Sequence, residues 1–315
     1  MRALLIHNPQ SGQRDRSREI SAAAAQLSSA GWNVELTTPT EVAEIEALSR
    51  AAVERELDAV VVAGGDGTAS AAAQALAHQR TALGIIPIGT TNVWAREMGI
   101  PLNVLAATDV LLNGEIAQVD LGQANRRYFL FVASAGFDAS VTRDVDERAK
   151  RRLGMLAYVI AAIVEAFKLR GEDVTVVADE RVSRQRVLMV VANNARLYGG
   201  VLKMSPQAYA DDGLLDVWVF RGRGLFAAIV HAINVVLGRH TRDPGTEYYR
   251  SARVIIDARR PMPVQLDGDY FGTTPVAFRV VPGALRAIIP RGPHPQLRHA
   301  KARAMGDEGT GTEQP

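Results

Sequence analysis

The sequence predicts an α/β protein with an N-terminal three-layer α/β domain and a C-terminal β-sandwich domain. Apolar runs alternate with helical patterns up to Glu115, as in a parallel sheet with right-handed crossovers. Runs within 58–63 and 82–88 are almost continuously apolar, which is typical of strands buried on both faces. Short strands joined by turns dominate after Glu115. We therefore predict domains at 1–115 and 116–290, and a flexible tail at 291–315.

In the first domain each apolar run is followed by a helical stretch. We expect strands at 3–7, 33–37, 58–63 and 82–88, and helices at 17–30, 41–56, after Thr68 to about His78, and 101–112. Gly31 ends the first helix, because glycine favours the position after a helix.

In the second domain the pattern is mostly that of strands. We expect them at 117–121, 128–134, 174–178, 186–192, 215–220, 253–257, 264–266, 277–281 and 285–289. Two helices, at about 147–169 and 224–237, interrupt these strands.

Composition narrows the class of protein. The 315 residues are 47% hydrophobic and 22% charged, with a net charge of +2, which argues against a nucleic-acid binder held by a broad basic surface. The absence of cysteine excludes disulfides, thiolate metal sites and a cysteine nucleophile. The start lacks the apolar core of a signal peptide, and the longest apolar runs are short for a membrane span. We expect a cytoplasmic protein, soluble or bound at a membrane surface.

Three small polar loops follow strands of the first domain. Gly64-Gly65-Asp66-Gly67-Thr68 lies between a strand and a helix, where close backbone approach and helix N–H groups favour a phosphate. The alternative is a tight turn with Asp66 as a helix cap. The loops at 8–12 and 87–92 end two other strands, so all three share one crevice of the sheet.

From these loops onward the chain resembles the diacylglycerol kinase catalytic family, which includes bacterial lipid kinases and the sphingosine and ceramide kinases. The matching residues are Asn8-Pro9-x-Ser11-Gly12, Gly64-Gly65-Asp66-Gly67-Thr68, Pro87-x-Gly89-Thr90-x-Asn92, Ala95-Arg96, Asp120-Leu121-Gly122, Ser134-x-Gly136-Phe137-Asp138, Tyr198-Gly199-Gly200, Pro206-x-Ala208, Asp212-Gly213-x-Leu215-Asp216 and Asp267-Gly268. The glycine loop alone is shared with NAD kinases and phosphofructokinases, whereas the later set is more specific.

The resemblance implies a lipid kinase that uses ATP and Mg²⁺ to phosphorylate a lipid hydroxyl. By likeness, the nucleotide site would comprise Asn8, Ser11, Gly12, Gly64, Gly65, Gly67, Thr68, Gly89, Thr90 and Asn92. Asp66 and Asp267 would be catalytic, with Asp267 taking the proton of the lipid hydroxyl. Without the resemblance, residues 267–269 would be interpreted as a hairpin turn.

The resemblance also implies a structural Mg²⁺ away from the phosphates. Its ligands would be Asp212 and backbone carbonyls near Tyr209 and Leu214, with Asp120 behind a bridging water. The alternative is an acidic turn that leads into a strand.

The sequence departs from the family at two positions. Asn92 is followed by Val93 where diacylglycerol kinases of this type commonly have Asp, a change that leaves the lipid class open. The family's Asp-Gly-Glu is Asp267-Gly268-Asp269 here, so the last carboxylate reaches one methylene less far.

The expected partner is a lipid substrate at the membrane surface, and a homodimer is compatible with the sequence. In the helix predicted at 147–169, an apolar stripe follows Arg148, Lys150, Arg151 and Arg152. Such a helix either docks on an anionic membrane or packs in the core with its first turns in solvent. Two other functions stay open. One is a kinase of a soluble acceptor such as NAD, and the other is a non-catalytic lipid-binding protein with the same fold, which only Val93 favours.

Overall fold

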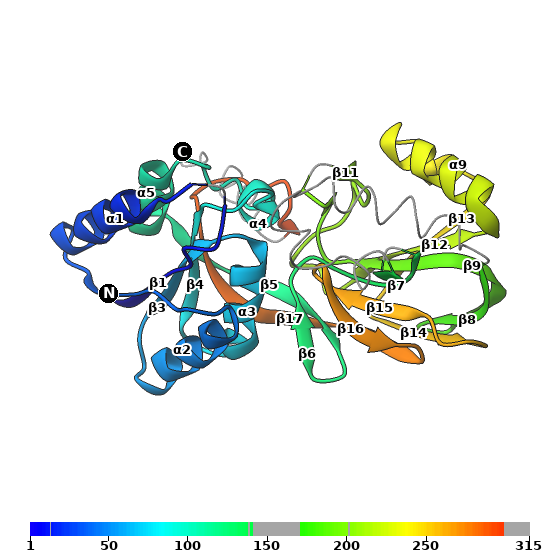
Figure 1. Cartoon of the computed structure of the whole chain (residues 1–315), viewed down its shortest axis with the longest axis horizontal. Coiled ribbons are helices and arrows are strands. Elements are labelled where there is room, and N and C mark those ends of the chain that lie inside the picture. The colour runs from blue at the N-terminus through cyan, green and yellow to red at the C-terminus, as the bar shows by residue number, and fades with distance from the viewer. Residues whose placement is uncertain (13, 138, 141–170, 201, 299–315) are drawn as a thin grey trace, which may run out of the picture.

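The computed structural model describes residues 1–12, 14–137, 139–140, 171–200 and 202–298, and it has two halves side by side (Figure 1). The first half comprises β1 (Arg2–His7), α1 (Ser17–Ser29), β2 (Asn33–Thr37), α2 (Ala43–Glu54), β3 (Ala59–Gly64), α3 (Asp66–Leu76), β4 (Ala82–Pro87), α4 (Val93–Glu97) and α5 (Val104–Asn113). Its strands pair in parallel in the order β2-β1-β3-β4. This is the sheet that the alternating pattern predicts.

The sheet of the first half is covered on both faces. Leu4 and Ile6 of β1 belong to the apolar cluster that includes residues of α2 and α3. Leu5, which points the other way, packs in a second cluster with residues of α1 and α5. The sheet therefore lies between two helical layers, which confirms the three-layer α/β prediction.

The second half is built from antiparallel strands around its own apolar core. Its elements are β5 (Glu115–Ala124), β6 (Arg127–Phe129), β7 (Val132–Gly136), β8 (Glu172–Ala178), β9 (Arg181–Asn193), β10 (Leu197–Tyr198), β11 (Leu202–Lys203), β12 (Leu215–Arg221), α9 (Gly224–Val236), a 3₁₀ turn (His240–Arg242), β13 (Thr246–Ser251), β14 (Arg253–Ala258), β15 (Pro263–Leu266), β16 (Asp269–Thr273) and β17 (Val276–Ile289). Phe129 and Phe278 meet edge to face in the core, with ring centroids 6.0 Å apart.

The long strand β17 connects the two halves. Phe278 pairs with β5 and β14 in the second half, whereas Ala287 pairs in parallel with Leu83 of β4 in the first. The strands expected at 277–281 and 285–289 are thus one strand, whose pairing with β5 shifts register between Val281 and Leu285. Strand β5 begins at Glu115, and the domain division after this residue stays a prediction.

Several elements differ from the predicted pattern. The run at 128–134 splits into β6 and β7, and the sequence pattern does not predict α4, β10, β11, β13 or β16. Residues 291–298 pack against the fold where the composition predicted a flexible tail: Leu297 is buried, and Arg298 N–H donates to Asp211 at 2.6 Å. The helix predicted at 147–169 lies outside the described residues. Among the helices that are described, none is long and apolar enough to cross a membrane.

Candidate functional site

Thr68 links two of the three polar loops at the carboxyl ends of the strands. Its hydroxyl accepts a 3.0 Å hydrogen bond from the Asn8 side-chain amide and lies 3.3 Å from the Ser11 hydroxyl. The Gly65 N–H in turn donates to the Ser11 hydroxyl at 3.2 Å. Because Thr68 is only 2% exposed, it holds the loops together from beneath and does not itself line an opening.

The third loop reaches the first two through glycine backbones. A Cβ on Gly89 would lie 2.5 Å from the Cα of Gly65, and a Cβ on Gly12, whose φ is +81°, would lie 2.2 Å from the Ile88 carbonyl oxygen. Gly67 is exposed, and a Cβ there would meet nothing within 4 Å. Side chains are therefore excluded between the loops but not above the first turn of α3.

The amino end of α3 suits an anion. Gly65 is the residue before the helix, and it forms no side-chain cap on the first N–H groups. Exposed Gly12, Gly67 and Thr90 belong to the three loops that meet here. Uncapped helix N–H groups at an accessible glycine turn bind phosphate groups well.

Asp66 holds the third loop in place. Its carboxylate accepts hydrogen bonds from the Thr91 hydroxyl at 2.8 Å and from the Trp94 N–H at 3.2 Å. The sequence left open whether Asp66 caps its own helix, and the structure has it bound instead to the start of α4. The carboxylate thus joins the α3 loop to the segment 91–94.

Asn92 and Val93 occupy special positions at the start of α4. Asn92 has a φ of 49° and donates to the Gly89 carbonyl at 2.9 Å, while its buried Oδ1 has no hydrogen-bond partner among the described residues. Val93 is 6% exposed within the apolar cluster of α2 and α3, so this departure from the family pattern does not face an open cleft.

Asp267 joins the second half to α3. Its Oδ2 accepts from the Ser70 hydroxyl and the Leu130 N–H, both at 2.7 Å. Its Oδ1 accepts from the N–H groups of Phe131 at 2.9 Å and Val132 at 3.0 Å. These bonds use the N–H groups of the two residues between β6 and β7 and of the first residue of β7, which explains why the predicted strand is interrupted there.

The environment of Asp267 also affects its proton affinity. Burial raises the pKa of Asp267, against the lowering effect of the hydrogen bonds from Ser70 and the backbone. Ser70 lies one helical turn after Asp66 on α3, so both carboxylates adjoin the same helix face. Asp269 is exposed and lies two residues further on, in β16.

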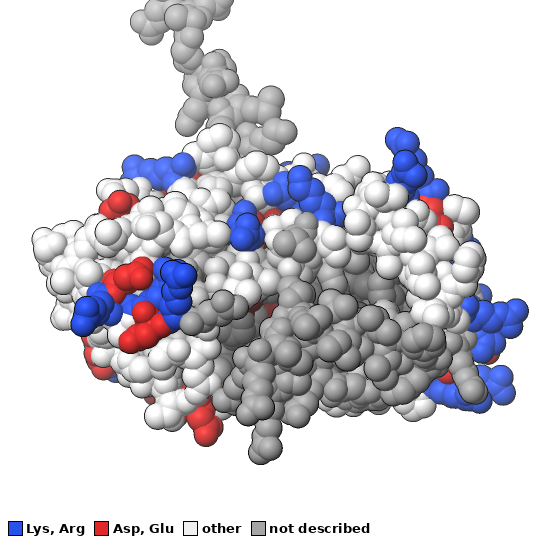
Figure 2. Space-filling view, turned by 45° about the horizontal axis from the view of Figure 1, so that its top comes forward, with Lys and Arg blue, Asp and Glu red and all other residues white. Residues whose placement is uncertain are grey.

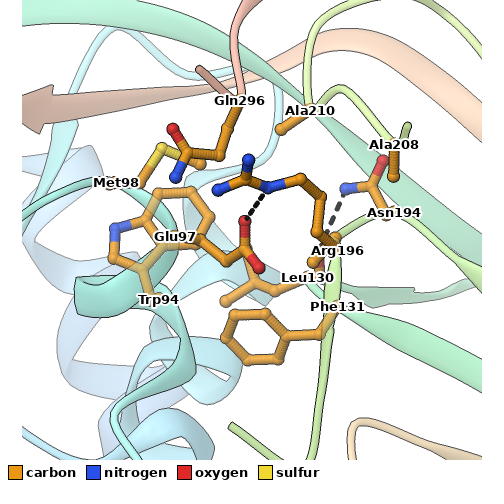
Figure 3. Close-up of a pocket in the computed structure, with 11 residues that line it drawn as sticks. Trp94, Glu97, Met98, Leu130, Phe131, Asn194, Arg196, Ala208, Ala210 and Gln296 are labelled. Atoms are coloured by element: carbon orange, nitrogen blue, oxygen red, sulfur yellow. Dashed lines mark hydrogen bonds and ion pairs between the residues drawn. The ribbon is translucent and has the colours of Figure 1, made fainter. Parts of the chain in front are cut away.

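A partly buried ion pair holds α4 against the second half, next to this site (Figure 3). Glu97 is 2% exposed, and its carboxylate accepts from Arg196 at 3.3 Å and from the Leu197 N–H at 2.7 Å. Burial raises the pKa of Glu97, and Arg196 opposes that shift. The pair borders a cavity of about 10 Å³, lined also by Trp94 and Phe131, which is room for about one water. Neither Glu97 nor Ser70 carries a sequence signal that could have identified it.

The predicted metal ligands lie together, and the carboxylates of Asp120 and Asp212 have protein partners. Asp120 accepts from the N–H groups of Gly213 and Gly283, both at 2.7 Å, and Asp212 forms an ion pair with Arg250. Burial raises the pKa of Asp120, with a further contribution from the charges of Asp211 and Asp212. In the described part of the chain, no group of three or more His, Cys, Asp or Glu residues is arranged to hold a metal. The metal site stays a prediction, and Tyr209 and Leu214 are half-buried in the same loop.

Both halves of the chain resemble known protein domains. The diacylglycerol kinase catalytic domain matches residues 2–124, and the YegS C-terminal NAD kinase beta sandwich-like domain matches residues 131–289. A diacylglycerol kinase of Bacillus subtilis (strain 168) is 30% identical over 299 residues, covering 94% of this chain and 99% of the relative. One from Staphylococcus epidermidis is 29% identical over 280 residues, covering 88% of each chain.

Solved structures support the same fold. Two crystal structures from Bacillus anthracis strain Sterne, the second of a diacylglycerol kinase, have TM-scores of 0.79 and 0.71 at 24% and 20% identity. Each covers 91% of this chain, with 97% and 96% of the other chain covered. At these identities they show the fold alone. The fold, the site and the sequence relatives together define a lipid kinase. The chain belongs to the diacylglycerol kinase family.

Proposed function

We propose that the protein transfers the γ-phosphate of ATP to the free hydroxyl of diacylglycerol. The observation that carries this proposal is the position of two carboxylates beside α3. Asp66 orders the loops around the uncapped amino end of α3. Asp267 accepts a hydrogen bond from Ser70, which lies one helical turn after Asp66. An anion site and a proton acceptor on one helix face suit phosphoryl transfer to a hydroxyl.

The three loops would bind the nucleotide. The first-turn N–H groups of α3 suit its phosphates, and Gly67 leaves space for them. Bound Mg²⁺ would neutralise charge on the phosphates. Thr68 contributes by fixing Asn8 and Ser11 and not by direct contact.

Asp267 would receive the proton of the acceptor hydroxyl at Oδ2. Among the donors to Asp267 in the described residues, the Ser70 hydroxyl can rotate away, whereas the other three are backbone N–H groups. The substrate oxygen then bonds to the γ-phosphorus as the bond from that phosphorus to the β-phosphate oxygen breaks, and ADP leaves. A raised pKa strengthens the carboxylate as a base.

The structural Mg²⁺ near Asp212 has no part in this mechanism. Arg250 and backbone N–H groups already bind the carboxylates that would hold it. The family resemblance alone supports a cation here, and on that ground we keep the site as a proposal. Metal analysis of the dialysed protein, comparing wild type with Asp212→Asn, tests it: equal metal content would exclude this site.

Product analysis tests the proposed function. The protein is incubated with ATP, Mg²⁺ and a total lipid extract, and the products are identified by mass spectrometry. We expect phosphatidic acid to accumulate. A phosphorylated sphingoid base would identify a sphingoid lipid, and not diacylglycerol, as the acceptor. Phosphorylation of NAD added in a parallel reaction, without any lipid product, would support the soluble-acceptor alternative. Loss of ATP-dependent products altogether would support the non-catalytic one.

A further inference from the structure

Helix α9 turns its apolar side away from the protein. A continuous helical stripe of large apolar side chains is exposed; its members are Phe226 (80%), Ile229 (46%), Val230 (36%), Ile233 (51%), Val236 (68%) and Leu237 (56%). A surface helix normally buries such a stripe in the core. The helix lies at the outer end of the second half, far from the first half (Figure 1).

The inner side of α9 is held largely by polar contacts. Its two buried residues are His231 and Val235. His231 makes hydrogen bonds of 2.9 Å to the Asp243 carboxylate and 2.7 Å to the Arg221 carbonyl, and Asn234 donates to the same carboxylate at 2.9 Å. These bonds fix which way the helix faces. The outward apolar stripe is therefore a built feature and not the result of a loosely attached helix.

The exposed charges that flank α9 are arginines, and the next carboxylate along the chain, Asp243, is bound by His231 and Asn234. Residues 222–242 contain no Asp or Glu, and they include Arg223 before the helix and Arg239 and Arg242 after it. All three arginines are exposed, and none forms an ion pair with another described residue. Figure 2 shows this end of the molecule as largely uncharged, with mainly Lys and Arg at its margins. An apolar strip bordered by arginines matches the acyl region and the anionic head groups of a bilayer.

We propose that α9 is a membrane-docking helix that lies in the head-group region of an anionic bilayer, with Phe226, Ile233 and Val236 inserted and the flanking arginines on lipid phosphates. This inference rests on the proposed function to the extent that a lipid kinase must reach its substrate at a membrane. It assigns docking to the described helix α9, separately from the basic segment predicted at 147–169.

Co-sedimentation with vesicles of phosphatidylcholine and phosphatidylglycerol tests the proposal on the full chain. We expect Phe226→Glu/Val236→Glu to bind about 100-fold more weakly than wild type, because two inserted side chains are lost. Arg239→Gln/Arg242→Gln should weaken binding by about tenfold or more, and only to vesicles that contain phosphatidylglycerol. The matched control is Val182→Glu, since Val182 is 59% exposed on β9 and should not affect binding.

Two further measurements separate the inference from the proposed function. Turnover of a water-soluble short-chain diacylglycerol should be unchanged in the α9 variants, while turnover of vesicle-borne diacylglycerol should fall. Vesicle binding that depends on α9 without any lipid phosphorylation would support docking and contradict the proposed function. Unchanged vesicle binding by the Phe226 and Val236 variant would overturn the docking helix. So would a change from dimer to monomer in sedimentation velocity without any change in vesicle binding, because α9 would then contact a second copy.

Discussion

The hydroxyl of Ser70 donates a 2.7 Å hydrogen bond to Oδ2 of Asp267, across a sequence separation of 197 residues. Ser70 belongs to the helix that starts with Asp66, and Asp267 follows β15 in the second half. This bond, together with the backbone bonds of Asp267 to residues 130–132, ties the turn between β15 and β16 to α3 and to the start of β7. The predicted base thus has a structural role as well.

Asp267→Asn should lower both turnover and stability. Removal of the base should reduce kcat by about 10² to 10⁴. Either orientation of the new amide places its NH₂ group against a backbone N–H, since each oxygen of Asp267 accepts at least one such bond. We expect the free energy of unfolding to fall by about 1–3 kcal/mol, measured by urea denaturation. The control is Asp269→Asn, because Asp269 is exposed. An equal loss of kcat in that variant would indicate that Asp269 is the base.

Two glycines of the loops should respond differently to alanine. Gly89→Ala brings a Cβ to 2.5 Å from Gly65 Cα and should disrupt the loops, so both melting temperature and ATP affinity fall. Gly67→Ala meets no protein atom within 4 Å and should keep the melting temperature while weakening ATP binding. Differential scanning calorimetry and nucleotide titration measure the two effects. Normal ATP affinity in Gly67→Ala would show that the phosphates do not bind beside Gly67.

Thr68→Val tests whether Thr68 acts from beneath the loops. The substitution keeps the shape but removes the hydroxyl that Asn8 and Ser11 contact. We expect a loss of about 1–3 kcal/mol in the free energy of unfolding, because the Asn8 amide is left unpaired in a buried place. ATP should bind more weakly through loop disorder. Unchanged stability with lost ATP binding would instead indicate a direct contact of Thr68 with the nucleotide.

The sequence predicted those features that local patterns encode. Continuous apolar runs identified the strands β3 and β4, and clustered glycines identified the loops that follow them. It could not predict that Thr68 faces inward, or that Asp66 binds α4, because both depend on contacts between loops. The division at Leu130 and Phe131 depends on Asp267, more than a hundred residues away. Half-exposed β13 and β16 lack a strong apolar alternation.

Asp216 should make stability depend on pH. Burial raises the pKa of Asp216 to about 6, although the Tyr248 hydroxyl donates to it and Arg250 lies near. The folded state then binds the proton more tightly than the unfolded chain, so its contribution to stability is present at low pH and is lost as pH rises from about 4 to about 6. Compared with Asp216→Asn, wild type should lose on the order of 3 kcal/mol over that range in urea denaturation. Parallel pH profiles for the two proteins would contradict this assignment.

The most direct test of the account is transfer of radiolabelled γ-phosphate from ATP. Dioctanoylglycerol, sphingosine and NAD are offered together to wild type and to Asp66→Ala, whose loops lose the bonds to Thr91 and Trp94. We predict label in the phosphatidic acid formed by wild type and nearly none with the variant. Label in NADP or in sphingosine phosphate with none in phosphatidic acid, or equal labelling by both proteins, would contradict the account.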